Sequence, residues 1–594
     1  MITVAAALIK LNGRLLVARR AAGRREAGLW EFPGGKIEPG ETAQQCLKRE
    51  LFEELGITAS IGEFFAENIH HYPHGTIRLQ AYRVTWEAGT IKLKDHDAVR
   101  WLTPVEMSPA EFAPADVPFL AQLHLYMTKY PPVLHDPKTL LDHPLAQPAR
   151  RVALRLQTAG FEACFAGGCV RDALLGLLPR DIDVATSALP DEVEALFPKT
   201  IAVGKAFGVI VVLQDDEPIE VATFRTDGNY ADGRRPDSVA FRTAAEDAAR
   251  RDFTINGLFL DPASGALQDY VGGLADLQAH RVAAIGQPEE RFAEDHLRML
   301  RAVRFAGTLG FTIDPATEDA IRRLAPLVAK VSTERIGQEV TRILNESQQP
   351  GTSLRLLAAV GLLPVVLPEV AAMQGVEQPP QYHPEGDVFT HTCLMLDSMP
   401  PAPRDLRLTL AVLLHDVGKP PTASLEQLPG GRSIIRFRNH AAVGVEMTES
   451  ILRRLKLKNS LIEDVAAMVG RHMNFAQVPQ MKRSTLRRFI SSPFFELELE
   501  LARLDALHST GDMQACEVAR QAHEEFRQDQ ASALPPRWIT GKDLLRLGMT
   551  EGEAIGALLE EAYDRQLEGT VPDRAALLAW VESRLSDNLT NNHH

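Results

Sequence analysis

Two aspartates follow a glycine pair in the stretch GGCVRDALLGLLPRDIDVA, which begins at Gly167. The apolar run before the glycines predicts a strand, and a helix is expected from about Val170 to Leu178. A second strand should then carry Asp181 and Asp183, and because side chains two residues apart on a strand point the same way, the two carboxylates share one face. Paired carboxylates beside a glycine turn that can approach phosphates suit two magnesium ions in phosphoryl or nucleotidyl transfer.

A third carboxylate, Glu220, lies in the apolar run PIEVATFR. Asp-x-Asp alone is as often a solvated strand end as a metal site. With the glycine pair and the later RRDFTIN stretch, however, residues from about Ala149 to about Leu344 resemble the tRNA nucleotidyltransferase and poly(A) polymerase family, in its bacterial CCA-adding form. The resemblance implies a polymerase beta-like mixed sheet with a catalytic carboxylate trio of Asp181, Asp183 and Glu220. The residues that we expect to bind nucleotide are Gly167, Gly168, Arg171, Arg251 (phosphate), Asp252 and Asn256 (ribose).

A helix is expected over PEERFAEDHLRMLRAVRFAGTLGF, and it would carry Glu294, Asp295 and Arg298. Because Asp295 and Arg298 are three residues apart, they should lie side by side and present an acceptor and a donor in one plane, as a complementary base does. An ordinary intrahelical salt bridge is the alternative. In the resembled family this element is the protein template that selects CTP and ATP. Arg301 and Arg304 continue the stripe and are candidates for phosphate contact.

A second cluster of carboxylates lies in LWEFPGGKIEPGETAQQCLKRELFEELGI, where a Gly-rich loop precedes a helix that should begin near Thr42. Glu50, Glu53 and Glu54 stand at i, i+3 and i+4 on that helix, so they share one face. Such close like charges repel unless a cation lies among them, and magnesium is the natural one. The complete pattern resembles the Nudix box.

The Nudix resemblance extends to the MutT-like nucleoside triphosphate pyrophosphohydrolases over nearly all of residues 1–127. It implies that the carbonyl of Gly34 joins Glu50 and the catalytic Glu53 and Glu54 in holding Mg²⁺. It further implies that Arg49 orients the glutamates, Arg20 faces substrate phosphate and Asp116 takes part in base recognition, with the base left open. A degenerate Nudix fold used for docking is the alternative.

Histidines and aspartates recur between about Gln374 and Met513. His391, His415–Asp416 and Asp505 have the order H, HD, D, and they resemble the HD phosphohydrolase superfamily. Imidazole with carboxylate suits Mg²⁺, Mn²⁺, Ni²⁺ or Fe²⁺, which would activate water against a phosphoester. A second metal site could be completed by His440 and His472. The resemblance suggests 2',3'-cyclic phosphates or 2'-nucleotides as substrates.

At 594 residues the chain is too long for a single core. We expect a multidomain α/β plus all-α protein: a Nudix α/β/α sandwich, a nucleotidyltransferase head, a helical neck, a helical HD domain and a helical tail. The expected ranges are 1–127 for the Nudix domain, 128–148 for a linker, 149–275 for the head, 276–373 for the nucleotide-selecting and RNA-binding neck, 374–513 for the HD domain and 514–594 for the tail.

The composition of the chain indicates which binding partners and which cellular compartment to expect. The net charge of -14 means that RNA would have to meet a local basic surface rather than a basic whole. None of the five cysteines forms a Cys-x-x-Cys pair, which favours reduced thiols in the cytoplasm. The N-terminus has no basic region typical of a signal peptide, and prolines interrupt the longest apolar stretch. Neither membrane nor DNA is an expected partner.

The three resemblances together imply an enzyme that adds CCA to tRNA 3' ends from CTP and ATP, fused to a Nudix hydrolase of nucleoside triphosphates and to an HD phosphohydrolase. A poly(A) polymerase, or an enzyme that adds only CC or only A, shares the head motifs and stays open. A third possibility is a regulator that binds RNA but has inactive catalytic sites. The intact acidic and histidine residues argue against it.

Overall fold

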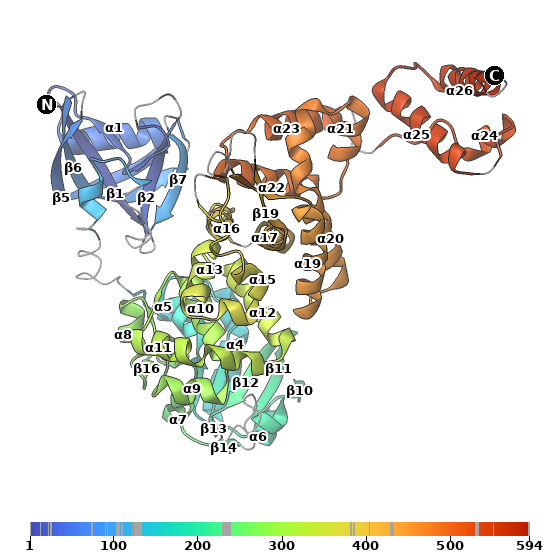
Figure 1. Ribbon diagram of the computed structural model, residues 1–594. Coiled ribbons are helices and arrows are strands. Elements are labelled where there is room, and N and C mark those ends of the chain that lie inside the picture. The colour runs from blue at the N-terminus through green and yellow to red at the C-terminus, as the bar shows by residue number, and fades with distance from the viewer. Residues whose placement is uncertain are drawn as a thin grey trace. The chain divides into compact units, whose positions relative to one another are not determined.

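The computed structural model contains two compact units, one made of Met1–Gly228 and Asp237–Ile285 and the other of Asn229–Pro236 and Gly286–His594. Figure 1 labels their helices and strands. Among the helices in the described ranges, none has both the length and the apolar character of a membrane span. The structure describes residues 2–11, 14–21, 23, 26–72, 75–89, 91, 93–94, 96–102, 107, 111–120, 123, 134–202, 204–227, 239–379, 383, 386–402, 404–427, 433–528, 534–550 and 552–591.

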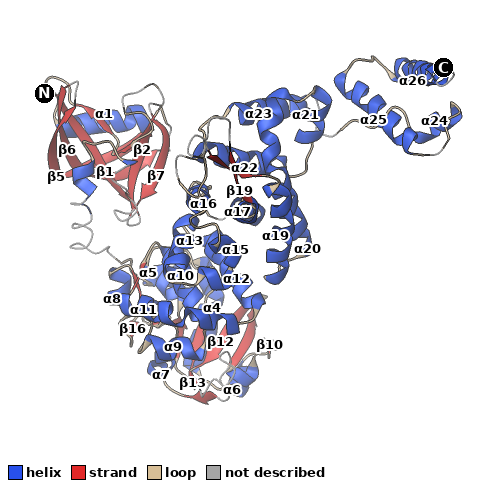
Figure 2. Ribbon diagram, viewed as in Figure 1, coloured by secondary structure: helices blue, strands red, loops and turns tan. Residues whose placement is uncertain are grey.

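The first domain is a mixed sheet with helix α1 (Ala43–Leu55) on one face. Its strands are β1 (Ile2–Leu11), β2 (Arg14–Arg20), β3 (Trp30–Glu31), β4 (Gly34–Lys36), β5 (Ile57–Tyr72), β6 (Gly75–Gly89) and β7 (His96–Leu102). They are ordered β3-β2-β1-β6-β5, with β4 paired to β1 and β7 paired to β2. Strand β1 runs parallel to β6 and antiparallel to β4. Figure 2 shows the strands of this domain together with α1.

Both faces of this sheet are covered, which explains the continuous apolar run in β1. On one side Ala7 packs with Leu51 of α1, and on the other Leu8 packs with Phe119. The capping box of Thr42 and Gln45 starts α1, and Gly56, at φ +69°, ends it. The helix start expected near Thr42 is therefore present, and α1 covers one face of the sheet, as the expected α/β/α sandwich requires.

The head domain contains the second seven-stranded sheet, ordered β10-β11-β12-β9-β8-β15-β16. Strands β12 and β9 are parallel, whereas β8 pairs antiparallel with β9 and β15. The expected mixed sheet is thus observed. The strands are β8 (Ala163–Ala166), β9 (Val184–Thr186), β10 (Thr200–Ile201), β11 (Val209–Gln214), β12 (Glu217–Thr223), β15 (Leu258–Leu260) and β16 (Leu267–Asp269).

Several helices accompany this sheet, and a short ribbon of two strands follows β12 in the chain. The helices are α4 (Gln147–Thr158), α5 (Gly168–Leu174), α6 (Pro190–Leu196), α7 (Ala244–Ala249) and α8 (Gly273–Gln278), and the ribbon strands are β13 (Arg225–Asp227) and β14 (Val239–Phe241).

Helix α5 differs from the sequence prediction because it ends at Leu174 instead of Leu178. Gly176 adopts φ +70°, a left-handed conformation in which glycine is favoured, so the helix cannot continue to the proline. Its missing side chain also makes room for His135, whose Nε2 would lie 2.6 Å from a Cβ at this position. The backbone N–H of His135 donates to Leu174 O over 2.9 Å.

The expected linker is structured in its second half. Helix α3 (Lys138–Asp142) and a 3₁₀ turn (Pro144–Ala146) lead directly into α4. Leu140 and Leu141 are buried, and Arg150 of α4 donates to Leu141 O over 3.2 Å. This segment therefore packs on the head domain, so the described part of the expected 128–148 linker contains secondary structure; residues 128–133 lie outside the described residues.

The second unit is mainly helical, as Figure 2 shows. Its neck contains α9 (Pro288–Glu294), α10 (Arg298–Leu309), α11 (Pro315–Leu324), α12 (Thr333–Glu346), α13 (Pro350–Ala359), α14 (Leu363–Val366) and α15 (Pro368–Ala371). The single helix expected from Pro288 onward was wrong, because Asp295 is extended (φ -146°, ψ 105°) and separates α9 from α10.

The HD domain contains α16 (Val388–Asp397), α17 (Leu406–Leu414), α18 (Lys419–Thr422), α19 (His440–Arg454), α20 (Asn459–Arg471), a 3₁₀ helix (His472–Gln480), α21 (Arg483–Ile490) and α22 (Phe495–His508). Helix α23 (Gln514–Gln528), which was expected in the tail, shares a hydrophobic core with this domain through Cys516 and Ala519. Every residue of α17 from Leu408 to Leu414 is buried, so this helix is central to the domain. The sequence prediction missed the hairpin of β19 (Ala423–Gln427) and β20 (Ser433–Phe437).

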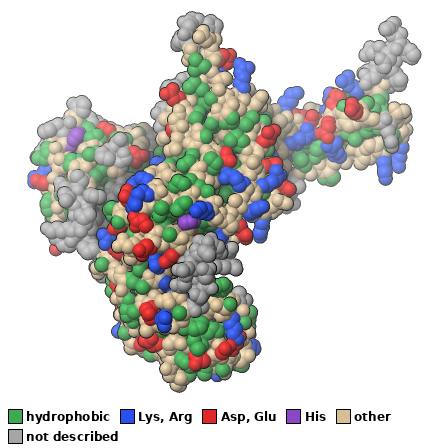
Figure 3. Space-filling view, turned by 60° about the horizontal axis from the view of Figure 1, so that its bottom comes forward, with side chains coloured by type: hydrophobic (Ala, Val, Ile, Leu, Met, Phe, Trp, Pro, Cys, Tyr) green, Lys and Arg blue, Asp and Glu red, His purple; other side chains and the backbone are tan. Residues whose placement is uncertain are grey.

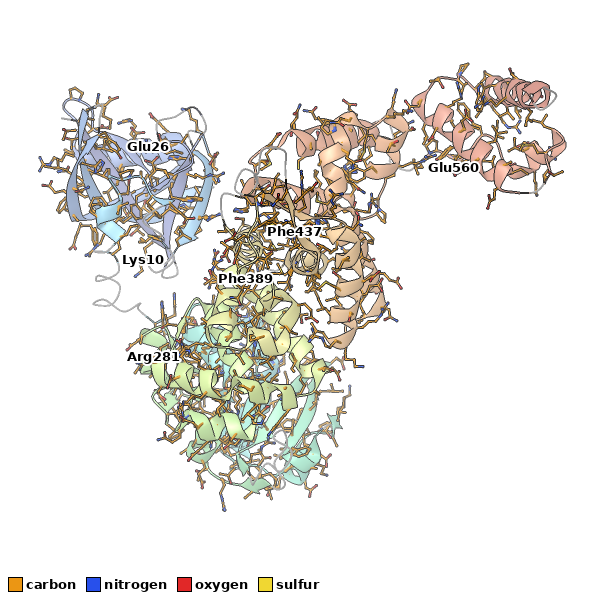
Figure 4. All side chains as sticks on the ribbon, viewed as in Figure 1. Lys10, Glu26, Arg281, Phe389, Phe437 and Glu560 are labelled. Carbon is orange, nitrogen blue, oxygen red and sulfur yellow. The ribbon has the colours of Figure 1, made fainter. Side chains whose placement is uncertain are left out.

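The tail has its own small core, in which Leu544, Leu558 and Leu577 pack together. It comprises α24 (Gly541–Arg546), α25 (Glu553–Glu568) and α26 (Arg574–Asn591). Glu560 of α25, labelled in Figure 4, binds Arg488 of α21 over 2.9 Å.

Candidate active sites

The carboxylates of the head domain gather where β9 begins. Asp181 and Asp183 precede β9 instead of lying within it, yet the Asp183 carbonyl accepts from Ala166 N over 3.2 Å and so continues the pairing with β8. Ile182 is buried while Asp181 and Asp183 keep some exposed surface, so the two carboxylates lie on the same side. Desolvation, followed by the negative charges of Glu220 and Asp181, raises the pKa of Asp183 to about 6. Such a site fits divalent cations, because a cation would relieve this repulsion.

Gly167 allows an arginine to approach the turn before α5. Its φ is +80°, and a Cβ at this position would lie 2.7 Å from Arg251 Nη1. The same guanidinium donates to both Asp247 Oδ2, over 3.1 and 3.2 Å, and Asn256 O, over 3.2 Å. These hydrogen bonds therefore hold the Arg251 guanidinium at the glycine turn, on the side of the carboxylates. Its positive charge partly offsets the rise in the pKa of Asp183.

Asp252 and Asn256 form a buried chain with Arg171. The amide of Asn256 accepts from Arg171 Nη1 over 2.7 Å and donates to Asp252 Oδ1 over 3.0 Å. Asp252 also accepts from Phe253 N over 2.8 Å. The chain of hydrogen bonds fixes the orientation of the Asn256 amide.

The residues of the expected nucleotide template are not paired as the sequence predicted. Arg298 donates to Glu294 Oε2 and to Arg291 O. Asp295 instead accepts two hydrogen bonds from Arg335 of α12, over 2.7 and 3.2 Å. The predicted side-by-side pair of Asp295 and Arg298 is therefore wrong, because Asp295 caps α9 outside the helical register.

The arginines further along α10 differ from each other in exposure. Arg304 is 5% exposed and donates to Glu339 Oε2 over 2.8 Å. Its burial lowers its pKa to about 10 against the opposing charge of Glu339. This position has the geometry of a structural ion pair, so it does not support phosphate contact by Arg304. Arg301 is partly exposed, with its guanidinium 5.4 Å from the Phe305 ring centre.

The acidic face of α1 in the NUDIX-like domain lies against the glycine loop. A Cβ on Gly35 would come within 2.2 Å of the Glu50 carboxylate, so this glycine provides the space that Glu50 occupies. Arg49 donates to Glu41 over 3.0 Å and to Glu50 over 2.8 Å, and its Nη1 lies 3.6 Å from Glu53 Oε2. The guanidinium thus fixes the carboxylates as the resemblance implied, and hydrogen bonding to Glu41 and Glu50 raises the pKa of Arg49. Gly34 packs so closely on β1 that its Cβ would overlap Ala5 O.

Arg20 is bound by a carboxylate that sequence reasoning did not single out. It donates through Nε to Glu31 Oε2 over 2.7 Å. The other oxygen of Glu31 lies 3.1 Å from Nε2 of His96, which is buried under α1. Burial lowers the pKa of His96, but the hydrogen bond to Glu31 and the charges of Glu31 and Glu54 outweigh it, so the pKa is raised.

Asp116 is buried and accepts from Phe32 N over 3.2 Å. Desolvation, with the charge of Glu31 adding to it, raises the pKa of Asp116 well above its ordinary range. A protonated carboxyl offers one donor and one acceptor, so it can hydrogen-bond to a base edge as an amide does.

The histidines and aspartates of the HD domain form two groups. In each group three ligand atoms lie within 4.8 Å of one another. The first is His391, His415 and Asp505, and the second is Asp416, His440 and His472. His391 Nε2 lies 3.2 Å from Asp505 Oδ1, and His440 Nε2 lies 3.3 Å from His472 Nε2. Within the described part of the chain these are the groups that satisfy this criterion, and sequence reasoning named every member.

Three of the imidazoles are oriented through their Nδ1 atoms. His415, His440 and His472 each place Nδ1 within 2.6–2.9 Å of a backbone carbonyl three residues earlier. Because a carbonyl only accepts, Nδ1 carries the proton and Nε2 keeps a lone pair. Neutral imidazoles with oriented lone pairs beside carboxylates are the donor set that divalent transition metals prefer. Burial is the main cause that lowers the pKa of His472, to about 4.

Lys419 is a buried residue of the HD domain that sequence reasoning missed. Its ammonium group lies 2.7 Å from Asp416 Oδ2 and donates to Gln378 Oε1 over 2.7 Å. It also lies 5.5 Å from the ring centre of Phe437, which is labelled in Figure 4. The spacing of His415–Asp416 to a lysine three residues on was the available sequence signal.

Charged side chains of both signs are interspersed on the described surface in the view of Figure 3. No single basic stripe marks an RNA path among the residues drawn in colour on that face.

Four family models match separate parts of the chain. They are the NUDIX domain over residues 1–123, the Poly A polymerase head domain over 163–283, the "Probable RNA and SrmB- binding site of polymerase A" over 310–374 and the HD domain over 388–509. The nucleotidyltransferase, NUDIX and HD families generally use divalent metals.

The curated relatives are CCA-adding enzymes. That of Limosilactobacillus reuteri (strain DSM 20016) is 48% identical over 217 residues, 36% of this chain and 53% of the relative. That of Geobacillus stearothermophilus is 46% identical over 220 residues, 37% of this chain and 54% of the relative. The chain therefore spans about half the length of the curated relatives it matches.

A solved structure extends the likeness. The CCA-adding enzyme of Bacillus stearothermophilus in complex with CTP is 28% identical, with a TM-score of 0.56, and the match covers 76% of this chain and 100% of that chain. This match covers a larger share of the chain than the matches to the curated relatives do. The chain is thus similar in its head domain to CCA-adding enzymes and poly(A) polymerases, and other parts of it match the NUDIX and HD domain models.

Proposed function

We propose that the protein adds C, C and A to the 3' end of tRNA, using CTP and ATP without a nucleic-acid template. The observation that carries the proposal is the head site, in which Asp181, Asp183 and Glu220 lie near a glycine turn that holds Arg251. Mg²⁺ held by these carboxylates would activate the attacking 3'-hydroxyl and bind the triphosphate.

The chain's own residues orient the nucleotide. Arg251, fixed by Asp247 and by the Asn256 carbonyl, offers positive charge to the triphosphate beside the bare backbone of Gly167. Gly168 and Arg171 complete this nucleotide-binding turn, and the Asp252–Asn256 pair offers polar groups for the ribose. In the neck, Glu294, Asp295 and Arg298 select the base, and Arg301 contacts phosphate.

The NUDIX site hydrolyses a nucleoside triphosphate to a monophosphate and pyrophosphate. Glu50, Glu53, Glu54 and the carbonyl of Gly34 would hold Mg²⁺, while Arg49 keeps the carboxylates in place. Arg20 faces the phosphates, and Asp116 contacts the base. The HD site would hold divalent metal through the two groups described above and hydrolyse a phosphoester.

Single substitutions separate the three activities. Asp181→Ala should abolish extension of a tRNA transcript that lacks CCA, while Glu53→Gln should abolish pyrophosphate release from nucleoside triphosphates and Asp416→Asn should abolish hydrolysis of a 2',3'-cyclic nucleotide. Each variant should keep the other two activities. Extension that survives Asp181→Ala would contradict the proposal for the head, and a polymerase that adds A alone would replace it with poly(A) synthesis.

The presence of both domains in one chain suggests a functional link between the NUDIX site and the transferase site. The NUDIX domain would remove damaged nucleoside triphosphates before the transferase incorporates them. Equal error rates in wild type and Glu53→Gln, in reactions spiked with oxidised nucleotides, would contradict this coupling.

A further inference from the structure

A bulge in strand β7 turns His96 inward. The register between β2 and β7 runs regularly to Arg19 opposite Ala98, and then Arg20 lies opposite His96, so Asp97 is the extra residue. A bulge of this kind re-aims the side chains beside it. Asp97 is exposed and binds Arg19 over 2.7 Å, whereas His96 is 7% exposed and lies under α1.

One ring nitrogen of His96 is hydrogen-bonded to a carboxylate. Nε2 lies 3.1 Å from Glu31 Oε1, and Glu31 is itself held by Arg20. Because an ionised carboxylate only accepts, Nε2 donates the proton and Nδ1 of the neutral ring keeps a lone pair. A carboxylate that binds the far nitrogen of an imidazole orients that ring toward a metal in many metalloproteins.

The other nitrogen faces the metal-binding helix. His96 Nδ1 is buried, makes no hydrogen bond within the described part of the chain and lies 3.9 Å from Glu54 Oε2. This separation is too long for a hydrogen bond, which spans about 2.7–3.2 Å. It fits two ligand atoms on one cation, because bonds of about 2.0–2.2 Å place such atoms about 3–4 Å apart.

We propose that His96 Nδ1 is a nitrogen ligand for a divalent transition metal that it shares with Glu54. The proposal deepens the NUDIX function proposed above, since Glu54 belongs to that site, and it assigns the site a preference for Mn²⁺ over Mg²⁺. Magnesium favours oxygen ligands, whereas imidazole suits the later divalent metals. Glu31 and Arg20 then position the ligand without touching the metal.

Mn²⁺ bound to the full chain provides the test. Asp416→Asn and Asp505→Asn are introduced first to remove a carboxylate from each group of the HD domain. Electron spin-echo spectroscopy then detects nitrogen-14 bound directly to Mn²⁺, and titrations give the affinities for Mn²⁺ and Mg²⁺. His96→Gln keeps a donor toward Glu31 but lacks Nδ1, and Asp97→Asn is the matched control on the same strand.

In this parent chain we expect nitrogen modulation that disappears in His96→Gln and remains in Asp97→Asn. Mn²⁺ affinity should fall at least tenfold or so in His96→Gln, while Mg²⁺ affinity changes less than about threefold. Absence of the His96-dependent modulation, or equal weakening of both metals, would overturn the assignment of His96 as a ligand. If His96→Gln has no effect but Glu53→Gln loses Mn²⁺, only this inference fails; if Mn²⁺ binds equally well in both variants, the proposed NUDIX metal site fails as well.

Discussion

Asp295 is bound by Arg335 through two hydrogen bonds, while Arg298, three residues after Asp295, is bound by Glu294. The acceptor and the donor that would read a base are thus each fixed by a different partner. Arg335 comes from α12 and was not among the residues that the sequence analysis named. If Asp295 reads the base as proposed, its orientation depends on Arg335, a residue outside the Glu-Asp-x-x-Arg element.

Arg335→Ala should reduce the selectivity for CTP and ATP more than the total rate of addition. Loss of a charged hydrogen-bonding partner costs Asp295 its orientation, and an effect of about tenfold on the ratio of correct to incorrect nucleotide is expected. The measurement is single-nucleotide extension with each of the four triphosphates. Arg342→Ala is the control, since Arg342 lies on the same helix and pairs with Glu346 at the surface. Equal selectivity in both variants would contradict a positioning role for Arg335.

Arg304→Met should destabilise the second unit because it leaves Glu339 buried without its partner. Breaking a buried pair costs about 3–5 kcal/mol in free energy of unfolding, whereas replacing both members often costs little. Denaturant unfolding should therefore show a large loss for Arg304→Met and substantial recovery in Arg304→Met with Glu339→Leu. Arg301→Met, on the partly exposed neighbour, is the comparison. A double variant as unstable as the single one would show that Arg304 contributes through packing instead of charge.

Asp183→Asn should abolish transfer and yet raise the thermal midpoint of the metal-free head domain near neutral pH. The folded state raises the pKa of Asp183 from 3.8 to about 6, so it binds the proton more tightly than the unfolded chain does. Stability is then fully present below the unfolded value and is lost as pH rises through about 6. Thermal unfolding in EDTA at pH 5 and pH 8 should show the wild type losing more stability than Asp183→Asn. The same pH dependence in both proteins would argue against repulsion among the carboxylates.

Metal-free HD domain should lose stability as the pH falls from about 6.5 to about 4. The folded state lowers the pKa of His472 to about 4 from 6.5, so the unfolded chain binds the proton first and protonation favours unfolding. The lowered pKa of His440 acts in the same direction. Thermal unfolding in EDTA across this range measures the effect, and His472→Gln should flatten it. An unchanged slope in that variant would exclude His472 as its source.

The sequence was most informative where chemistry and periodicity coincide. The acidic face of α1, the order H, HD, D in the HD domain and the aspartates beside a glycine turn all lie in patterns where the residue types and their spacing point to the same site. The capping residues Thr42 and Gly56 set the bounds of α1 locally, and the apolar run of α17 could only be a buried helix. Local rules therefore predicted these elements.

Contacts between residues far apart in sequence were not predictable in the same way. The break between α9 and α10 depends on Asp295 leaving the helix to bind Arg335, forty residues away in the chain. Likewise, the bulge that turns His96 inward is set by the pairing of β7 with β2, and no periodicity in the sequence of the strand indicates it. Gly176, which follows the early end of α5, can be recognised in the sequence as a glycine. The packing of His135 against it could not be predicted, because His135 lies outside the range expected for the head domain.

The central claim is tested most directly by extension of a tRNA transcript that ends at the discriminator base, resolved to single nucleotides. With CTP alone we expect two additions, with ATP alone essentially none, and with both a ladder that stops after C, C and A and is absent in Asp181→Ala. A long run of A, growth limited to C or A when both triphosphates are present, or no extension by the wild type would contradict the account.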